Sequence, residues 1–306
     1  MTTILNPDNR LFTLARQGRR PPSALVAIAV VLFILVLVIV GESKSRLAVQ
    51  LIFPVGIQSI AEPIVENVVG FLPIYLGLWV WLRLSSKRPF WSLGLESPGA
   101  ARHALGGVLI AALMMAVTAG LAIISGATAG KSQMTGLTAL GIRLLSLMAY
   151  LVQGPGEEVL FRGWLLAVIG ARYRPWIGVL VSSLVFSLVH AGSILMAPLV
   201  PLAFLNLFLF GIFAAFYALS EGGLWGICVW HAVWNWAMGD LLGFATDGVP
   251  HIGVLISIRA TGPAIVTGGA FGPEGGVAAT AVFLIAIGII VMRTRRSGEG
   301  RLTSTD

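Results

Sequence analysis

Long apolar runs that contain almost no charge constrain this chain more than any other feature. About 20 apolar residues are enough for a helix to cross the hydrocarbon core of a bilayer, and helices satisfy their own backbone hydrogen bonds there. Eight such runs are present, at about 24–41, 62–82, 105–126, 138–169, 176–190, 194–219, 223–244 and 276–292. The sequence therefore predicts an all-α, polytopic membrane bundle of about eight transmembrane helices.

Charged residues are too few to cover a water-facing surface. Only 11% of the residues are charged, whereas 57% are hydrophobic, and the mean hydropathy is +0.91. Because soluble domains carry about 25% charged residues, the composition excludes a soluble globular protein and a disordered one. The single cysteine, Cys228, excludes a disulfide framework and a cysteine-based zinc cluster.

The basic residues follow the pattern of membrane topology. With the N-terminus inside and the runs alternating, the inside segments hold fourteen lysines and arginines and the outside segments four. Cytoplasmic loops are enriched in these residues, so we expect both termini in the cytoplasm and a lipid bilayer, not nucleic acid, as the partner. The predicted parts are a polar tail at 1–23, a transmembrane domain at 24–292 and a polar tail at 293–306, in a multi-pass protein of the bacterial inner membrane.

Three segments depart from this regular pattern. Residues 47–60 are apolar but contain Pro54 and Gly56, which predicts an interfacial segment. Gly154-Pro155-Gly156 predicts a kink or break in the fourth run, since proline removes a helical hydrogen bond. The glycine-rich outside loop at 245–275 predicts a re-entrant or surface-lying segment.

Placing an ionisable group at membrane depth costs free energy, so each such residue is a candidate functional residue. Glu157, Glu158 and Arg162 lie in the fourth run. Glu158 and Arg162 are four residues apart, so they share a helix face and can neutralise each other. Glu157 is rotated by about 100° from Glu158, which directs it away from Arg162. Two further pairs are also four apart: Phe186 with His190, and His231 with Asn235.

If their helices are straight, Glu157 and His190 lie roughly 20 Å and His231 about 12 Å from the cytoplasmic ends of their helices. The three sets can therefore meet at one level with modest tilt or an extended entry to the seventh run. A carboxylate, two imidazoles and an amide that converge in a low-dielectric cavity form an acid–base centre. Each of these residues also has a purely structural interpretation. Either histidine can be a packing residue, and the Glu158–Arg162 pair can serve only to join helices. Asn206 can join helices or line the cavity. Packing or solvated roles are expected for Trp230, Trp234, Trp236, Glu62, Glu66, His103, Asp240, Asp247 and His251.

The three sets also carry a family resemblance. Glu157-Glu158-x-x-x-Arg162, Phe186-x-x-x-His190 and His231-x-x-x-Asn235 occur in this order on successive predicted helices. They resemble the motifs of the CPBP family of intramembrane endopeptidases, which comprises the CAAX proteases and bacteriocin-processing enzymes. The resemblance covers about 139–244, and the chain looks like a bacterial member.

The resemblance implies a role for each residue. Glu157 matches the glutamate that activates water, with His190 assisting. Glu158 matches the supporting acid, and Arg162 its partner. His231 and Asn235 match the pair that stabilises the oxyanion. The implied activity is hydrolysis of a peptide bond in a membrane-associated protein or peptide.

Metal dependence is left open by the resemblance, since the family is described both as metalloproteases and as glutamate-dependent enzymes. A zinc site would need His190, His231 and Glu157 or Glu158 around one ion. Zinc would then occupy the groups required as base and oxyanion donors. A neutral amide such as Asn235 is also a better oxyanion donor than a ligand, so we favour no cofactor, with zinc as the alternative.

Two other functions remain alternatives. One is a non-catalytic membrane protein of the same fold, such as a bacteriocin immunity factor or an interaction scaffold. The other is a proton-coupled transporter, which the absence of an internal repeat disfavours. The sequence leaves open the substrate, its prenylation and the oligomeric state; in a bacterial protein a prenylated target is not expected.

Overall fold

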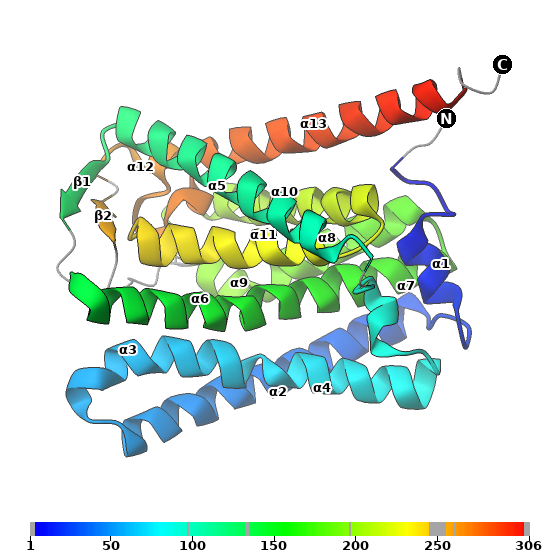
Figure 1. Ribbon diagram of the computed structural model, residues 1–306, viewed down its shortest axis with the longest axis horizontal. Coiled ribbons are helices and arrows are strands. Elements are labelled where there is room, and N and C mark those ends of the chain that lie inside the picture. Colours follow the sequence, from blue (N-terminus) through cyan, green and yellow to red (C-terminus); the bar gives the residue numbers. More distant parts are fainter. Residues whose placement is uncertain are drawn as a thin grey trace.

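A computed structural model describes residues 4–96, 98–131, 135–195, 197–244, 255–259 and 261–302 (Figure 1). In this part of the chain, six helical segments are long and apolar enough to cross a bilayer. They are α2 (Ala24–Ile52), the α3–α4 segment (Val55–Ser86), α5 (Ala100–Ile124), the α6–α7 segment (Gly136–Arg172), α10 (Val200–Glu221) and the start of α13 (Val277–Arg296). Two apolar helices, α8 (Pro175–Val189) and α11 (Trp225–Trp236), are shorter.

All eight predicted runs lie on these helices, which confirms the all-α membrane bundle. How many of them cross the bilayer stays a prediction. The remaining elements are short. They are α1 (Arg10–Arg16), α9 (Ala191–Ile194), α12 (Ala264–Thr267), β1 (Thr128–Lys131), β2 (Ile256–Arg259) and 3₁₀ turns at Phe90–Leu93, Gly269–Phe271 and Pro273–Gly275.

Several helices contain π-helical turns. One at Glu66–Gly70 joins α3 (Val55–Val65) to α4 (Leu72–Trp81), and one at Val159–Leu166 joins α6 (Gly136–Glu158) to α7 (Ala167–Arg172). Others follow α4 at Leu82–Ser86 and α11 at Ala237–Leu241. Such turns accompany functional sites in many helices, and the second one immediately follows the predicted Glu157-Glu158 pair.

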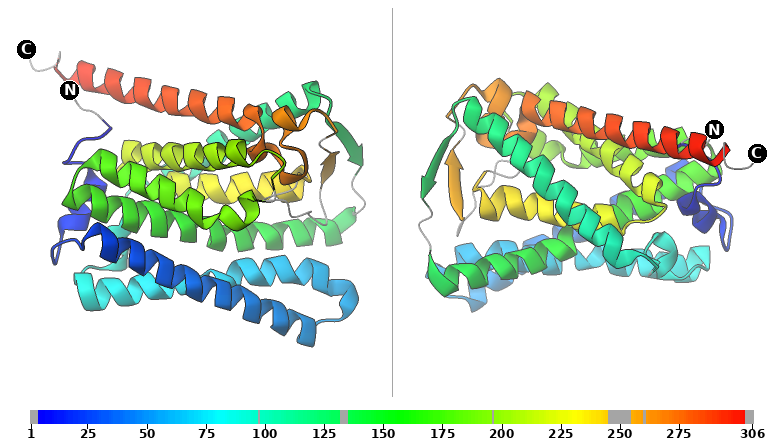
Figure 2. Two further views of the ribbon diagram at one scale, coloured as in Figure 1. Left: turned by 180° about the vertical axis from the view of Figure 1, so that it is seen from behind. Right: turned by 45° about the horizontal axis from the view of Figure 1, so that its top comes forward.

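The helices form layers around α11 (Figures 1 and 2). Helix α11 packs between α5 and α6, while α2, α3 and α4 form an outer layer against α6, and α13 packs on α10 at the opposite side. Two glycines permit the close approach to α11. A Cβ at Gly107 of α5 would lie 2.3 Å from the Gly226 carbonyl oxygen, and one at Gly154 of α6 would lie 2.8 Å from the Ala232 nitrogen. Small residues of this kind let membrane helices pack closely.

The loops gather at two opposite ends of the bundle. At one end, the Arg88 guanidinium donates to the Leu14 carbonyl, Arg172 donates to the Pro21 carbonyl, and α1 packs against α7. The end of α13 lies at this same end (Figure 1). At the other end, β1 and β2 form an antiparallel pair. The loops predicted to be cytoplasmic are thus separated from those predicted to lie outside.

The segment predicted to be interfacial, 47–60, consists of helix on both sides of a tight turn, and its position relative to the bilayer stays a prediction. Helix α2 continues to Ile52, only Phe53 and Pro54 form the turn, and α3 begins at Val55. Pro54 caps the start of α3, where its missing N–H has no helical partner to lose. Residues 47–60 are therefore the adjoining ends of two antiparallel helices.

Of the kink or break predicted at Gly154-Pro155-Gly156, the break is wrong, because α6 passes through Pro155 without interruption. The Tyr75 hydroxyl donates to the Val152 carbonyl at 2.6 Å, in the turn before the proline. The hydrogen-bond pattern then changes to the wider π type from Val159. Neighbouring side chains and π adjustments commonly replace the hydrogen bonds that a proline removes in a membrane helix.

Both predicted tails contain helix within the described residues. Helix α1 buries Leu11, Phe12, Leu14 and Ala15, which form one apolar face within the predicted tail. Helix α13 continues to Leu302. In the loop predicted at 245–275, residues 245–254 and 260 lie outside the described part of the chain. Pro273, Glu274 and Gly275 are buried in a 3₁₀ turn, so this end of the loop enters the bundle.

Candidate active site

The end of α6 and the π-helical stretch after it carry the Glu158–Arg162 pair. Arg162 Nη1 donates to Glu158 Oε1 at 2.9 Å, and both side chains are fully buried. The predicted ion pair is therefore present. Arg162 also lies over the ring of Phe186, 4.6 Å from its centroid, a cation–π contact of the kind that strengthens away from water.

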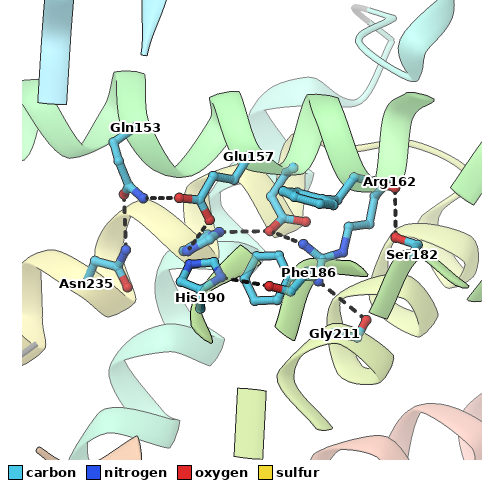
Figure 3. Close-up of polar contacts among 11 residues, drawn as sticks. Gln153, Glu157, Arg162, Ser182, Phe186, His190, Gly211 and Asn235 are labelled. Atoms are coloured by element: carbon cyan, nitrogen blue, oxygen red, sulfur yellow. Dashed lines mark hydrogen bonds and ion pairs between the residues drawn. The ribbon is translucent and has the colours of Figure 1, made fainter. Parts of the chain in front are cut away.

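Glu157 has different partners from its neighbour, as Figure 3 shows. Gln153 Nε2 donates to Glu157 Oε1 at 2.7 Å. The other oxygen, Oε2, lies 3.9 Å from His231 Nε2, beyond direct hydrogen-bond distance. Two consecutive glutamates thus differ sharply: Glu158 faces an arginine, whereas Glu157 faces an amide and an imidazole.

His231, on α11, lies between the two carboxylates. Its Nδ1 is 2.8 Å from Glu158 Oε1, so this nitrogen donates its proton to an oxygen that already accepts from Arg162. Its Nε2 points to Glu157. If His231 is protonated, the charges of Glu157, Glu158, Arg162 and His231 sum to zero. A neutral sum is the favourable state for a buried cluster, and it makes Nε2–H a donor toward the Glu157 side.

His190 follows the end of α8 and packs on Phe186, with ring centroids 4.6 Å apart. Its Nδ1 is 2.8 Å from the Phe186 carbonyl oxygen. A carbonyl only accepts, so Nδ1 carries the proton and Nε2 is an acceptor in the neutral ring. Figure 3 shows this ring beside Phe186 and below Glu157. The second predicted motif therefore fixes the tautomer that a general base requires.

Phe186 joins these parts through its ring. Its centroid lies 5.2 Å from that of Phe161 and 5.1 Å from that of Phe210. Phe210 in turn lies 4.8 Å from the ring of His231. These aromatic side chains pack around the polar groups, which keeps the local dielectric low and the interactions strong.

Asn235 lies one helical turn beyond His231 and reaches Glu157 through a residue that the sequence analysis missed. Asn235 Nδ2 donates to Gln153 Oε1 at 3.1 Å, and Gln153 donates to Glu157. The hydrogen-bond roles of both amides follow from this network. Gln153 is buried and lies four residues before Glu157, so it shares that helix face. This spacing was the signal that could have identified it.

Most residues outside the three motifs have the packing roles expected of them. Trp230 and Trp234 are fully buried and stacked, with centroids 5.0 Å apart. The amide nitrogen of Asn206 donates to the carbonyls of Glu274 and Gly276, so this residue joins α10 to the segment before α13.

The other acidic residues and histidines divide into three groups. Glu62 and Glu66 both contact Arg46, and His103 contacts Glu221. The solvated role expected of Asp240 is wrong, since it is buried and hydrogen-bonded to Ser146. Asp247 and His251 lie outside the described residues.

The proposed zinc ligands do not form a metal site in this arrangement. Among the described residues, no three His, Cys, Asp or Glu side chains are placed to hold a metal ion. His231 Nδ1 is occupied by Glu158, and its Nε2 lies 3.9 Å from Glu157 Oε2. A zinc site would require His190, His231 and Glu157 to move from these positions, so zinc stays the alternative to a cofactor-free site.

Comparison with known families identifies the segment that carries this site. Residues 139–237 match the model of the family described as type II CAAX prenyl endopeptidase Rce1-like. The match includes all three motifs and confirms the resemblance found in the sequence. No curated protein shows significant sequence similarity to the chain. The chain is thus a multi-pass helical membrane protein whose segment 139–237 is similar to the Rce1-like family of CAAX-type intramembrane proteases.

Proposed function

We propose that this protein is an intramembrane endopeptidase that hydrolyses a peptide bond of a membrane-associated protein or peptide, in the inner membrane of a bacterium. The observation that carries the proposal is the different environment of the two glutamates. Glu158 is neutralised by Arg162, whereas Glu157 faces His231 across 3.9 Å. A water molecule can contact both Glu157 Oε2 and His231 Nε2 at this separation, which suits a carboxylate that activates water.

In the proposed reaction, Glu157, assisted by His190 Nε2, removes a proton from water as its oxygen attacks the scissile carbonyl carbon. The oxyanion that forms accepts hydrogen bonds from His231 Nε2–H and from the Asn235 amide. Collapse of the tetrahedral intermediate breaks the C–N bond, and the proton held by Glu157 passes to the leaving amine. Preorganised donors of this kind are often the largest contribution to catalysis.

Gln153 has a positioning role in this proposal. It holds Glu157 Oε1 and the Asn235 side chain through one amide group. The base and one oxyanion donor are therefore connected through a buried side chain with few alternative conformations. Catalytic groups need such support because small misplacements cost large factors in rate.

We propose that the reaction does not depend on a metal ion, because zinc would occupy Glu157, His190 and His231, the groups that are needed as the base and as an oxyanion donor. The test is the activity of detergent-purified protein after exhaustive chelation, with the metal content measured on the same sample. Full activity in metal-free protein supports the glutamate mechanism. Loss of activity that stoichiometric zinc restores would make His190 and His231 ligands instead.

The experiment on the proposed function uses purified protein in liposomes and two fluorogenic peptides, a farnesylated CAAX peptide and its unmodified counterpart. We expect Glu157→Gln, His190→Ala and His231→Ala each to lower turnover by about 10²–10⁴-fold, the range of general acid–base groups. Glu62→Gln is the matched control, since it removes a partly exposed carboxylate of the Arg46 cluster. Normal turnover in a variant would remove that residue from the site.

The same assay separates the alternatives. Cleavage of the farnesylated peptide alone would make prenylation a determinant of recognition. Cleavage of both peptides would place recognition in the polypeptide. The folded wild-type protein could also cleave neither of them nor any peptide of a membrane-tethered library. That result would favour a non-catalytic membrane protein of the same fold over a protease.

A further inference from the structure

A pocket lies away from the candidate active site, between α5, α10 and α13. Its volume is about 580 Å³. The walls are apolar and include Ile110 and Leu113 of α5, Phe213 of α10, and Ile289 and Ile290 of α13. None of the residues of the three motifs lines it. Figure 1 shows α5 and α13 crossing on this side of the bundle, with α10 behind them.

One residue of the pocket lining, Tyr217, carries a buried hydroxyl without a hydrogen-bond partner in the described part of the chain. Tyr217 of α10 is 5% exposed, and its Oη atom contacts no donor or acceptor in the part of the chain that the structure describes. The facing position on α5 is Gly106, where an added Cβ would still be 3.8 Å from this oxygen. An unpaired buried hydroxyl destabilises a protein, so a ligand that supplies an acceptor oxygen here would be bound favourably.

The mouth of the same pocket is polar and basic. Ser220, Thr294 and Arg293 line it. Arg293 begins a basic stretch that continues with Arg295 and Arg296 at the end of the bundle that holds α1. Ser220 is three residues beyond Tyr217, so the mouth lies about 4.5 Å further along α10 than the buried hydroxyl. A ligand that fits must be apolar at one end, carry an acceptor oxygen in the middle and be anionic at the other end.

We propose that this pocket binds one anionic phospholipid. An acyl chain lies between the apolar side chains of α5 and α13, an ester carbonyl oxygen accepts the Tyr217 hydroxyl proton, and the headgroup phosphate contacts Arg293. Basic pockets between transmembrane helices at the cytoplasmic side bind anionic headgroups in this manner. The pocket volume accommodates the glycerol region and the upper part of one chain, and the remaining lipid extends along the surface of the bundle.

The test is native mass spectrometry of the full-length protein after exchange into mixed micelles of equimolar phosphatidylglycerol and phosphatidylcholine. We expect one tightly retained phosphatidylglycerol per protein. Arg293→Ala is expected to weaken its retention by about fivefold, the effect of one basic residue near an anionic headgroup. The matched control is Arg296→Ala, which removes the same charge from the same helix but not from the pocket lining.

Tyr217→Phe provides a second variant that does not depend on charge. It removes only an oxygen that has no protein partner, so the lipid-free protein is expected to remain folded, with unchanged or higher stability. Its retention of phosphatidylglycerol is expected to fall by severalfold. Equal retention of the two lipids, equal effects of Arg293→Ala and Arg296→Ala, or unchanged binding in Tyr217→Phe would each overturn the proposal.

Discussion

At the scale of single residues, Glu158 is the most demanding group in the molecule. It is fully buried, and its Oε1 accepts from both Arg162 and His231. Its Oε2 has no hydrogen-bond partner within the described residues. The carboxylate therefore depends on these two hydrogen-bond donors for its stability in a low-dielectric site.

Loss of Arg162 should consequently destabilise the fold. We predict that Arg162→Ala lowers the free energy of unfolding by about 3–5 kcal/mol, because it leaves a buried charge without its main partner. The measurement is reversible unfolding in mixed micelles. The double variant Glu158→Gln/Arg162→Met should recover much of this loss, since replacement of a whole buried pair is often neutral. Arg46→Ala, at an exposed ion pair, is the control. An Arg162→Ala protein as stable as the wild type would contradict the prediction.

Gln153 can be separated from the catalytic residues by its kinetic signature. We predict that Gln153→Leu lowers kcat by about tenfold or more, the equivalent of one lost hydrogen bond, and leaves KM within about twofold. A positioning residue supports the transition state without contacting the ground-state substrate, so the two constants respond differently. Gln153→Asn should also be impaired, because the shorter side chain does not reach Glu157. A matching increase in KM would assign Gln153 to substrate binding.

Residues of the site were predictable from the sequence where spacing alone decides contact. Four-residue spacing within one helix placed Glu158 with Arg162 and His190 with the Phe186 turn, and both contacts are present. The position of His231 between two glutamates was not predictable. It depends on the rotation of α11 relative to α6, which packing between distant segments determines.

At the scale of elements, glycines control how closely the helices of the site approach. A Cβ at Gly211 of α10 would lie 2.7 Å from the Cβ of Ser183 and 2.8 Å from its Cα, so α8 and α10 touch at their backbones. The Gly211 carbonyl also accepts a long hydrogen bond of 3.5 Å from Arg162. This contact therefore links the spacing of two helices to the position of the arginine.

We predict that Gly211→Ala lowers stability by about 1–3 kcal/mol, the usual cost of an added methyl group in a packed core, and lowers activity with it. Gly141→Ala is the matched control, because Gly141 lies in α6 with nothing within 4 Å of an added Cβ. That variant should be as stable as the wild type or more stable. Unfolding of the two purified variants under one condition measures the difference. Equal stability would show that α8 and α10 are not in backbone contact.

The positions of the helices were predictable from hydropathy, but the connections between them were not. The proline and glycine at 54–56 and at 154–156 were both interpreted as interruptions. One is a tight turn between long helices, and the other is absorbed into a continuous helix. Beside Pro155 the helix is contacted by Tyr75, which lies about 80 residues away in sequence and donates to the Val152 carbonyl. Local sequence contains no information about such a partner.

At the scale of the whole molecule, apolar content alone determined the fold class, because only helices satisfy their backbone within lipid at this composition. The pairing of β1 with β2 was unforeseen, since each strand has only four residues and they are more than 120 residues apart. The pairing has a topological consequence. Both loops must lie on the same side of the membrane, whichever side that is.

The final prediction tests this arrangement and the charge-based orientation together. Cys228 is the single cysteine and is buried, so one introduced cysteine reports one site. Arg174, Arg259 and Arg295 are exposed. With a membrane-impermeant maleimide, we expect Arg259→Cys to be labelled in intact cells, and Arg174→Cys and Arg295→Cys only after lysis, because inside loops carry the excess of Lys and Arg. The reverse pattern would preserve the bundle and invert its orientation. Labelling of Arg174→Cys and Arg259→Cys from one side would contradict the bundle itself, since the structure places these residues at opposite ends.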